Sequence, residues 1–149
     1  MPRAAVVRSP GALLLSVRPR FARAILDGTK TVELRRRFVR AAAGTPVIIY
    51  ASTPMMAVVG TARLRQVVVS DPNVAWLRHH PTLGLERVEF DEYLGGRMAC
   101  LLILEDVASL ESPLPLRGLQ EDGPFRPPQS YRYISSADPA RVRALVAEP

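Results

Sequence analysis

A chain of 149 residues, 48 % apolar and 23 % charged, is large enough for one domain with a buried core and too apolar to be a disordered chain. Its net charge of +6 is unevenly distributed: residues 1–65 carry twelve basic and two acidic side chains, whereas residues 66–149 carry eight and twelve. The basic surplus of the first part creates a positive local field, which favours a polyanionic partner.

The first predicted elements surround a turn between a helix and a strand. Residues 12–17, ALLLSV, form a short apolar run that predicts a buried strand. A helix is expected to follow, because Pro19 suits the first helical position and Gly28 suits the position just after a helix end. Residues 31–35 alternate between polar and apolar side chains, which predicts a half-buried strand. Lys30 therefore lies in a tight turn, where we expect an exposed side chain.

Three further strands are predicted from apolar runs. Residues 46–53 form a second buried strand, and residues 57–69 form a long or bent one in which Gly60 marks a bulge or a close approach. Residues 98–107, MACLLILEDV, are mostly apolar and predict a central strand. Residues 108–130 are rich in proline and are expected to form a long surface connection.

Short helices are predicted between and after these strands. Asp71 and Pro72 are typical of a helix N-cap and the first helical position, and Gly95 is expected to end a second short helix. An Asp-Pro pair recurs near the C-terminus and predicts a helix over residues 139–147. Strands of uneven spacing argue against a doubly wound parallel sheet. The sequence instead predicts an α+β fold, a small mixed β pseudo-barrel with short peripheral helices, as a single domain over residues 1–149.

Metal, cofactor and membrane motifs are not recognised in the sequence. His79 and His80 are adjacent, so on a helix they point in different directions, and no metal site is predicted. Neither a P-loop nor a dinucleotide-binding glycine motif is present, and no cofactor is expected. Cys100 lies among apolar residues and is interpreted as a core residue. The N-terminal apolar run is short and followed by arginines, so we expect no signal peptide, no membrane association and a cytoplasmic location.

The strongest motif is the pattern G-x-K-x-x-E-x-R, formed by Gly28, Lys30, Glu33 and Arg35. This pattern resembles the signature of the ASCH domain, a branch of the PUA-like superfamily. The flanking segments are similar in the same order: LLLSVRPRFARAILDG before the signature, then VIIYAST and VVG, and later PPQSYRYI. The resemblance covers about residues 12–134.

The resemblance implies a PUA-like pseudo-barrel with a cleft beside the signature loop. It also implies binding of RNA or another nucleic acid, and the four signature residues are then the expected site. Some members of this family are enzymes, either ribonucleases or amidohydrolases that act on acylated cytidine.

The chemistry of the signature side chains agrees with an anionic ligand. Glu33 and Arg35 lie two residues apart on one strand, so they face the same way and can form an ion pair, with Lys30 nearby. One carboxylate and two cations suit a phosphate or the polar edge of a base. Lys30 is the single lysine beside nineteen arginines, and unlike arginine it can lose a proton when desolvated. We expect it to matter through its shape or its proton, and its substitution to leave stability near native.

Further side chains extend the predicted nucleic-acid-binding surface with positive charge, hydroxyl groups and an aromatic ring. These candidates are Arg36, Arg37, Ser52, Thr53, Ser130 and Tyr131. Successive strand residues face alternate sides, so the neighbouring arginines cannot all line one cleft. Tyr50 and Tyr133 are weaker candidates for stacking on a base.

Two classes of function stay open. In the first, the chain is a binding module for RNA, for another nucleic acid or for a nucleotide. In the second, it is a small enzyme in which Lys30 acts as a base with Glu33, and ribonuclease activity is the favoured form. Amidohydrolase activity fits less well, because the related enzymes place a nucleophilic threonine three residues after the lysine, where this chain has Glu33.

Overall fold

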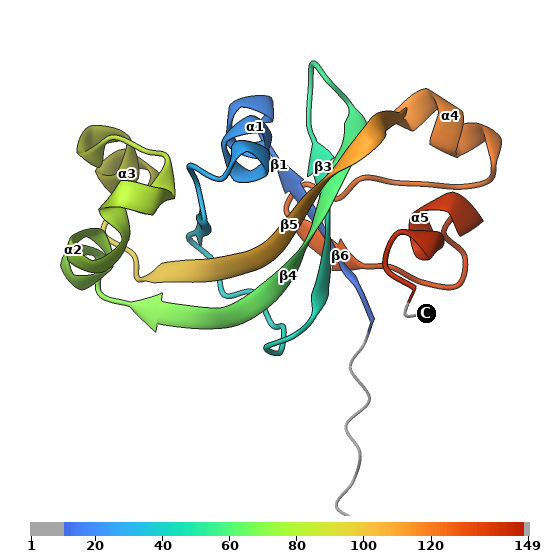
Figure 1. The fold of residues 1–149 in the computed structure, drawn as a ribbon. Helices are drawn as coiled ribbons and strands as arrows, with labels where there is room; N and C mark the ends of the chain where they lie inside the picture. The colour runs from blue at the N-terminus through green and yellow to red at the C-terminus, as the bar shows by residue number, and fades with distance from the viewer. Residues whose placement is uncertain (1–10, 148–149) are drawn as a thin grey trace, which may run out of the picture.

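The computed structural model describes residues 11–147, which form a six-stranded mixed sheet with short helices around it (Figure 1). The strands are β1 (Leu13–Val17), β2 (Val32–Arg35), β3 (Pro46–Ala51), β4 (Ala57–Ser70), β5 (Ala99–Pro115) and β6 (Tyr131–Tyr133). The helices are α1 (Pro19–Asp27), α2 (Pro72–Leu83), α3 (Arg87–Leu94), α4 (Leu116–Glu121) and α5 (Ala140–Ala144). The sheet curves into a half-barrel, which confirms the predicted α+β pseudo-barrel with peripheral helices.

The strand order leaves the half-barrel with two open edges. The order is β2-β5-β4-β3-β1-β6, so β2 and β6 are the edge strands among the described residues. β1 and β3 pair in parallel, whereas every other neighbouring pair is antiparallel. The parallel pair places the carboxyl ends of β1 and β3 side by side, directly before α1 and the β3–β4 turn.

Apolar side chains project from both faces of the sheet. Alternate residues of β1 show this directly: Leu13 and Leu15 pack inside the half-barrel with residues of α1, whereas Leu14 packs with residues of α4 and α5. A third cluster joins β2 and the start of β5 to α2 and α3. In Figure 1, α2 and α3 accordingly lie at one end of the sheet, and α4 and α5 lie at the other.

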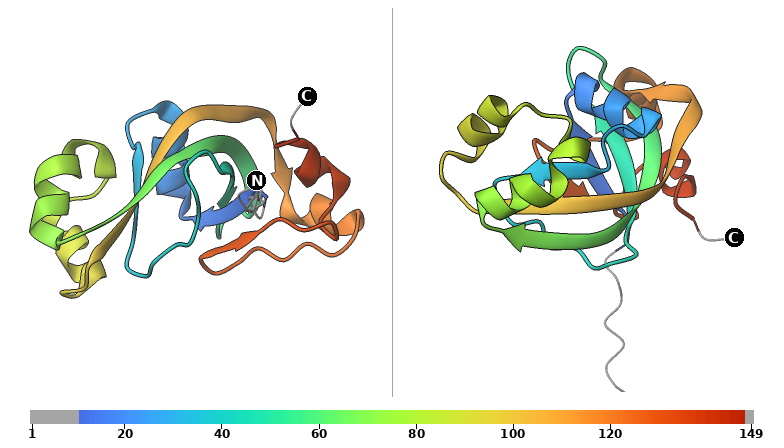
Figure 2. Two further views of the ribbon diagram at one scale, coloured as in Figure 1. Left: turned by 90° about the horizontal axis from the view of Figure 1, so that it is seen from below. Right: turned by 60° about the vertical axis from the view of Figure 1, so that its left-hand side comes forward.

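The strands β4 and β5 form a long curved arch (Figure 2). β5 continues to Pro115 and α4 follows it, so the prediction of a surface connection over residues 108–130 is wrong as far as residue 121. β2 pairs only with the beginning of β5, and the far part of β5 pairs with β4 alone. Proline lacks an N–H but is tolerated on such an open strand edge.

Gly60 provides the close approach that the sequence predicts. A Cβ atom at this position would lie 2.7 Å from the carbonyl oxygen of Ala108 on β5 and 2.5 Å from Cδ2 of Leu26 on α1. The register between β4 and β5 also shifts here. The absence of a side chain therefore lets α1 and both strands of the arch pack together.

The ends of the first three helices agree with the predicted capping residues. Pro19 opens α1, and Gly28 ends it in the left-handed conformation with φ 87°. The Asp71 carboxylate accepts from the backbone amide of Asn73 at 2.9 Å at the start of α2. Gly95 ends α3.

The C-terminal helix is shorter than the predicted range 139–147. It covers Ala140–Ala144, and Asp138 does not cap it. The Asp138 carboxylate is buried and instead accepts two bonds from Arg132 on β6, at 2.8 and 2.9 Å. A charge-assisted bidentate pair is stronger than a capping bond, which explains the different role of this carboxylate.

Cys100 is a core residue on β5, as predicted, with 3 % of its surface exposed. Burial raises the pKa of its thiol, which therefore stays protonated at neutral pH. Within residues 11–147, none of the helices combines the length and the apolar character needed to cross a membrane.

Gly60→Ala is expected to lower the free energy of unfolding by about 1–3 kcal/mol, because the added methyl group overlaps the Ala108 backbone. The matched control is Gly118→Ala in α4, where an added Cβ meets nothing within 4 Å. The control should be neutral or stabilising by about 0.5–1 kcal/mol, since alanine favours a helix over glycine. Urea unfolding of both variants checks this, and equal stabilities would contradict the close approach.

Candidate functional site

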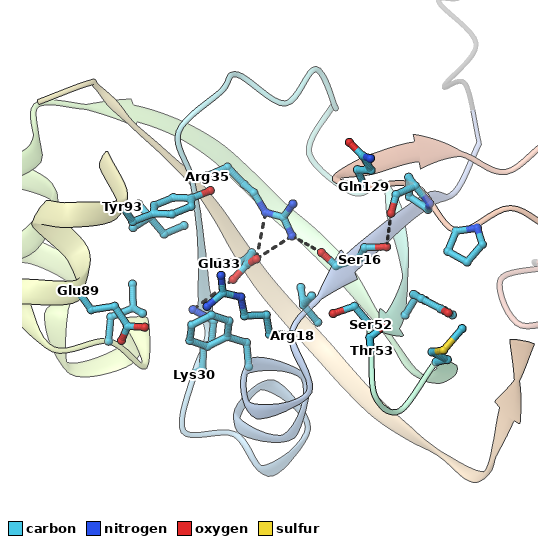
Figure 3. A pocket seen from close by; sticks show the side chains of 18 of the residues that line it. Ser16, Arg18, Lys30, Glu33, Arg35, Ser52, Thr53, Glu89, Tyr93 and Gln129 are labelled. Atoms are coloured by element: carbon cyan, nitrogen blue, oxygen red, sulfur yellow. Dashed lines mark hydrogen bonds and ion pairs between the residues drawn. The ribbon is translucent and has the colours of Figure 1, made fainter. Parts of the chain in front are cut away.

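A cleft of about 810 Å³ opens between β2 and the carboxyl ends of β1 and β3 (Figure 3). α3 forms the wall on one side, and residues 127–129, which precede β6, contribute on the other. The cleft thus occupies the space between the two edges of the half-barrel.

Lys30 lies at the floor of this cleft and is buried, with 1 % of its surface exposed. Its Nζ donates to the carbonyl oxygen of Val32 at 2.9 Å and to that of Leu83, and it lies 3.3 Å from Oε1 of Glu33. An ammonium group has three N–H donors, so these acceptors account for all of them. The prediction that Lys30 is an exposed turn residue is therefore wrong, and with it the expectation that its substitution costs little stability.

The surroundings of the Lys30 side chain are tightly packed and weakly hydrated. Gly84 ends α2 with φ 72°, and a Cβ atom there would lie 3.2 Å from Cδ of Lys30. The ring centroid of Phe21 lies 4.8 Å from Nζ on another side. Burial lowers the pKa of Lys30, while the carboxylate of Glu33 acts against this shift.

Glu33 connects the two cations of the signature. Its Oε1 faces Lys30, and its Oε2 accepts from Nε of Arg35 at 3.0 Å and lies 2.8 Å from Nη2 in the same ion pair. This confirms that the two β2 side chains share one face and form an ion pair. All four residues of β2 are buried, however, so β2 is not the half-buried strand that the alternating pattern predicts.

Arg35 extends the ion pair across the opening of the half-barrel. Its Nη2 donates to the carbonyl oxygen of Ser16 on β1 at 2.6 Å. Its Nη1 donates to the hydroxyl group of Ser130 at 3.0 Å and to the carbonyl oxygen of Ser130 at 3.4 Å. Together with the two contacts to Glu33, these bonds account for all five N–H donors of the guanidinium. Arg35, on the edge strand β2, thereby connects this strand to β1 and to Ser130, the residue just before the other edge strand, β6.

Two tyrosines of the edge strand β6 form further contacts with the connection that follows β2. The Tyr133 hydroxyl donates to the carbonyl oxygen of Arg40, and the Tyr131 hydroxyl accepts from the Arg40 amide at 3.4 Å. Arg40 lies in the connection between β2 and β3. Tyr131 therefore acts on the scaffold and does not line the cleft.

Other polar side chains face the cleft without a protein partner. Within residues 11–147, the Arg18 guanidinium and the hydroxyls of Ser52 and Thr53 form no hydrogen bond or ion pair. Figure 3 shows Arg18 reaching into the middle of the cleft, with Ser52 and Thr53 on one side and Glu89 and Tyr93 on the other. These donors remain available to a ligand.

Tyr50 adds a hydroxyl group to the same set. Its side chain lines the cleft, is 3 % exposed and packs against Phe125 with ring centroids 6.4 Å apart. In the described part of the chain, every fully buried side-chain polar atom has a partner, yet the Tyr50 hydroxyl has none. The hydroxyl must therefore belong to the small exposed part of this residue, at the cleft. Burial raises the pKa of Tyr50, which keeps the hydroxyl protonated and able to donate.

The wall formed by α3 carries an aromatic ring and two carboxylates. Tyr93 is half-buried, and the guanidinium of Arg36 lies 5.4 Å from its ring centroid. Glu89 forms an ion pair with Arg20, whereas Glu92 is exposed. This wall offers a face for stacking and acceptors for amino groups.

The structure brings part of the predicted site together. The predicted residues that line the cleft are Lys30, Glu33, Arg35, Ser52 and Thr53. Ser130 contacts Arg35 without lining the cleft itself. Gly28 is the exposed end of α1, and Arg36 and Arg37 are exposed after β2, so these three lie outside the cleft.

Sequence reasoning missed Arg18 and Tyr93, and it treated Tyr50 only as a stacking ring. Arg18 carried a usable signal, because it directly follows a buried strand and precedes Pro19, at the junction where a helix begins. No sequence signal indicated Tyr93, since its position at the cleft depends on how α3 packs against β2. Among the described residues, no group of three or more His, Cys, Asp or Glu side chains is arranged to hold a metal ion.

Comparison with known proteins gives a consistent group of relatives. A family model described as a domain of unknown function, DUF365, matches residues 12–119. An ASCH domain-containing ribonuclease of Zymomonas mobilis is 32 % identical over 137 residues, which cover 91 % of this chain and 92 % of that protein. The crystal structure of ASCH from Zymomonas mobilis superposes with a TM-score of 0.83 at 31 % identity, covering 93 % of this chain and 98 % of the other.

Two variant structures of the Zymomonas protein are equally similar. A serine-to-alanine variant has a TM-score of 0.83 at 30 % identity, and a tyrosine-to-phenylalanine variant has a TM-score of 0.82 at 31 % identity. They cover 93 % and 91 % of this chain, and 99 % of each variant chain.

Lys30→Met is expected to lower the free energy of unfolding by about 3–5 kcal/mol, because it leaves the buried Glu33 carboxylate with one cation fewer. Lys30→Arg should also destabilise, since its five donors exceed the three acceptors at this position. Arg23→Ala on the exposed face of α1 is the control and should change stability by less than about 0.5 kcal/mol. Thermal and urea unfolding measure these effects, and near-native stability of both Lys30 variants would refute the buried role.

Proposed function

The chain belongs to the ASCH domain family, and from this premise we propose that it binds single-stranded RNA in the cleft between β2, α3 and the ends of β1 and β3. The Zymomonas relative is named a ribonuclease, which favours RNA over other polyanions as the ligand. The cytoplasm remains the proposed location.

The proposal rests on one observation: some polar groups of the cleft are bonded within the protein, whereas others have no protein partner. Lys30 and Arg35 donate all their N–H groups inside the protein, so they shape the floor of the cleft. Arg18, Ser52 and Thr53 keep their donors free at the surface of the cleft. Free cations and hydroxyls suit the phosphates of a nucleic-acid strand, which are the commonest contacts of such proteins.

The opposite wall suits a nucleobase. Tyr93 presents a half-buried ring, and sequence-specific RNA recognition uses unstacked bases that lie against such rings. Unstacked bases are available in a single strand, whereas a duplex hides them. The two walls together therefore favour single-stranded RNA over a duplex.

Binding to a ten-nucleotide single-stranded RNA is expected to weaken roughly tenfold between 50 and 200 mM salt, as for two or three phosphate contacts. Tyr93→Ala should weaken binding at least about fivefold through loss of base stacking. Val88→Ala, at an exposed position of α3 outside the cleft, is the control. Fluorescence anisotropy measures these affinities, and no binding of wild-type protein at 50 mM salt would refute the function.

A second candidate function is RNA cleavage, and the unpartnered hydroxyl of Tyr50 favours it. In cleavage by the 2′ oxygen, that oxygen attacks phosphorus and loses its proton, while the bond to the 5′ oxygen breaks and this oxygen gains a proton. Tyr50 is protonated at neutral pH, since burial raises its pKa, and its hydroxyl can therefore supply a proton to the leaving oxygen. Lys30 with Glu33 remains the proposed base, a role in which Lys30 is uncharged and keeps only two of its three N–H contacts: burial favours the uncharged amine, whereas the contact with Glu33 opposes it.

Tyr50→Phe is expected to slow cleavage of labelled RNA about 10²- to 10⁴-fold, because the general acid is removed, while RNA affinity changes only a few-fold. Single-turnover assays with product analysis measure the rate, and acylated cytidine in a parallel assay tests for amidohydrolase activity. Cleavage at the wild-type rate would exclude Tyr50 as the acid. If the wild-type protein binds RNA and yields no product, the binding function stands alone.

A further inference from the structure

We propose that the carboxyl ends of β1 and β3, together with the N-terminus of α1, form a phosphate subsite inside the cleft, with Arg18, Ser52, Thr53 and Tyr50 as its donors. That the phosphate belongs to an RNA strand rests on the proposed function, whereas the subsite itself rests on the geometry of this corner of the sheet.

The parallel pairing of β1 and β3 creates the subsite. Val17 is in register with Ala51, and the amide of Ser52 donates to the carbonyl oxygen of Val17 at 2.9 Å. Arg18 and Ser52 directly follow the two strands, so they lie side by side at the carboxyl ends of β1 and β3. In open α/β sheets ligands bind outside the carboxyl ends of parallel strands, and the parallel pair of β1 and β3 offers a similar position before α1.

The helix that follows β1 adds favourable partial charge. α1 has nine residues and begins at Pro19, directly after Arg18. No side chain caps its N-terminus, and no acidic residue lies in its first turn. The N-terminus of α1 is therefore uncapped, and the nearby Glu89 of α3 pairs with the Arg20 side chain; Arg18 and Phe21 place this end of the helix at the cleft.

Tyr50 provides an independent indication of a ligand. It lies on β3 in register with Ser16, two residues before Ser52. The Ser16 hydroxyl already donates to the carbonyl oxygen of Pro128 at 2.7 Å. The Tyr50 hydroxyl has no protein partner although the residue is 3 % exposed, and it opens into the cleft. Because the rest of this side chain is buried and its hydroxyl is accessible from the cleft, the hydroxyl is held in place to donate to a ligand bound there.

The charges around the subsite favour an anion. Glu33 contacts two cations, and Glu89 pairs with Arg20, so both carboxylates are compensated. Glu92 is exposed on α3, across the cleft from β1 and β3. In Figure 3 Arg18 reaches the middle of the cleft, between the α3 wall and the two hydroxyl residues. A phosphate held there would place the attached nucleoside against the α3 wall.

The first test uses inorganic phosphate as the probe, at constant ionic strength and with chloride as the balancing anion. Amide resonances of Arg20, Phe21, Ser52 and Thr53 in isotope-labelled protein are expected to shift on titration. Arg18→Ala should abolish these shifts, and Arg23→Ala, which removes the same charge from the exposed face of α1, should preserve them. Absent shifts, or shifts that persist in Arg18→Ala, would overturn the subsite.

The second test separates the subsite from the proposed function. Arg18→Ala should weaken single-stranded RNA binding about tenfold and reduce the salt slope by about 0.7, as for one phosphate contact, whereas Arg23→Ala should not. RNA with and without a 5′-phosphate distinguishes a terminal from an internal phosphate. Equal RNA affinities of the two variants would overturn the subsite while RNA binding stands. If the wild-type protein binds no RNA, the proposed function fails, and the phosphate titration alone decides the subsite.

Discussion

The Arg35 guanidinium, which its ion pair with Glu33 holds in place on β2, is the group on which the architecture depends, because it connects β2 to β1 and to the residue before β6. Pairing of β2 with β6 would close the barrel and fill the space between them. Arg35 instead reaches from β2 to Ser16 and Ser130 with its side chain, which joins the edges and leaves an opening. Its five donors are satisfied and a carboxylate lies beside it, which are the conditions under which a buried charge is tolerated.

This arrangement changes the meaning of the signature pattern. Its residues were chosen from the sequence as contacts for a ligand, but Lys30 and Arg35 have no donor left for one. Arg35 connects β2 to Ser16 on β1 across the opening, whereas Lys30 holds the start of β2 against the end of α2. The groups at the cleft that have no protein partner belong to residues outside the pattern, above all Arg18 and Tyr50. A short sequence motif can thus lie at a cleft while its members form the floor of that cleft.

Local signals explain which parts of the fold could be predicted. Apolar runs and capping residues located all the strands but the last and the starts of α1 and α2, because these depend on neighbours in sequence. The extension of β5 through Pro115 could not be predicted, since it depends on pairing with β4 some fifty residues away and on an open edge that accepts proline. The burial of Lys30 depends likewise on α2, whose last carbonyl oxygen accepts one of its protons.

The single lysine can now be understood from the number of acceptors around it. Val32, Leu83 and Glu33 offer three acceptors in a buried space, which matches the three donors of an ammonium. A guanidinium would bring two donors more, and each unsatisfied buried donor costs about 1–3 kcal/mol. Its larger planar head would also have to fit beside Gly84, where the Lys30 stem already packs closely. An arginine therefore suits position 35, where the side chain spans an opening and has five acceptor contacts. A lysine suits position 30, which is enclosed at the other end of the same network.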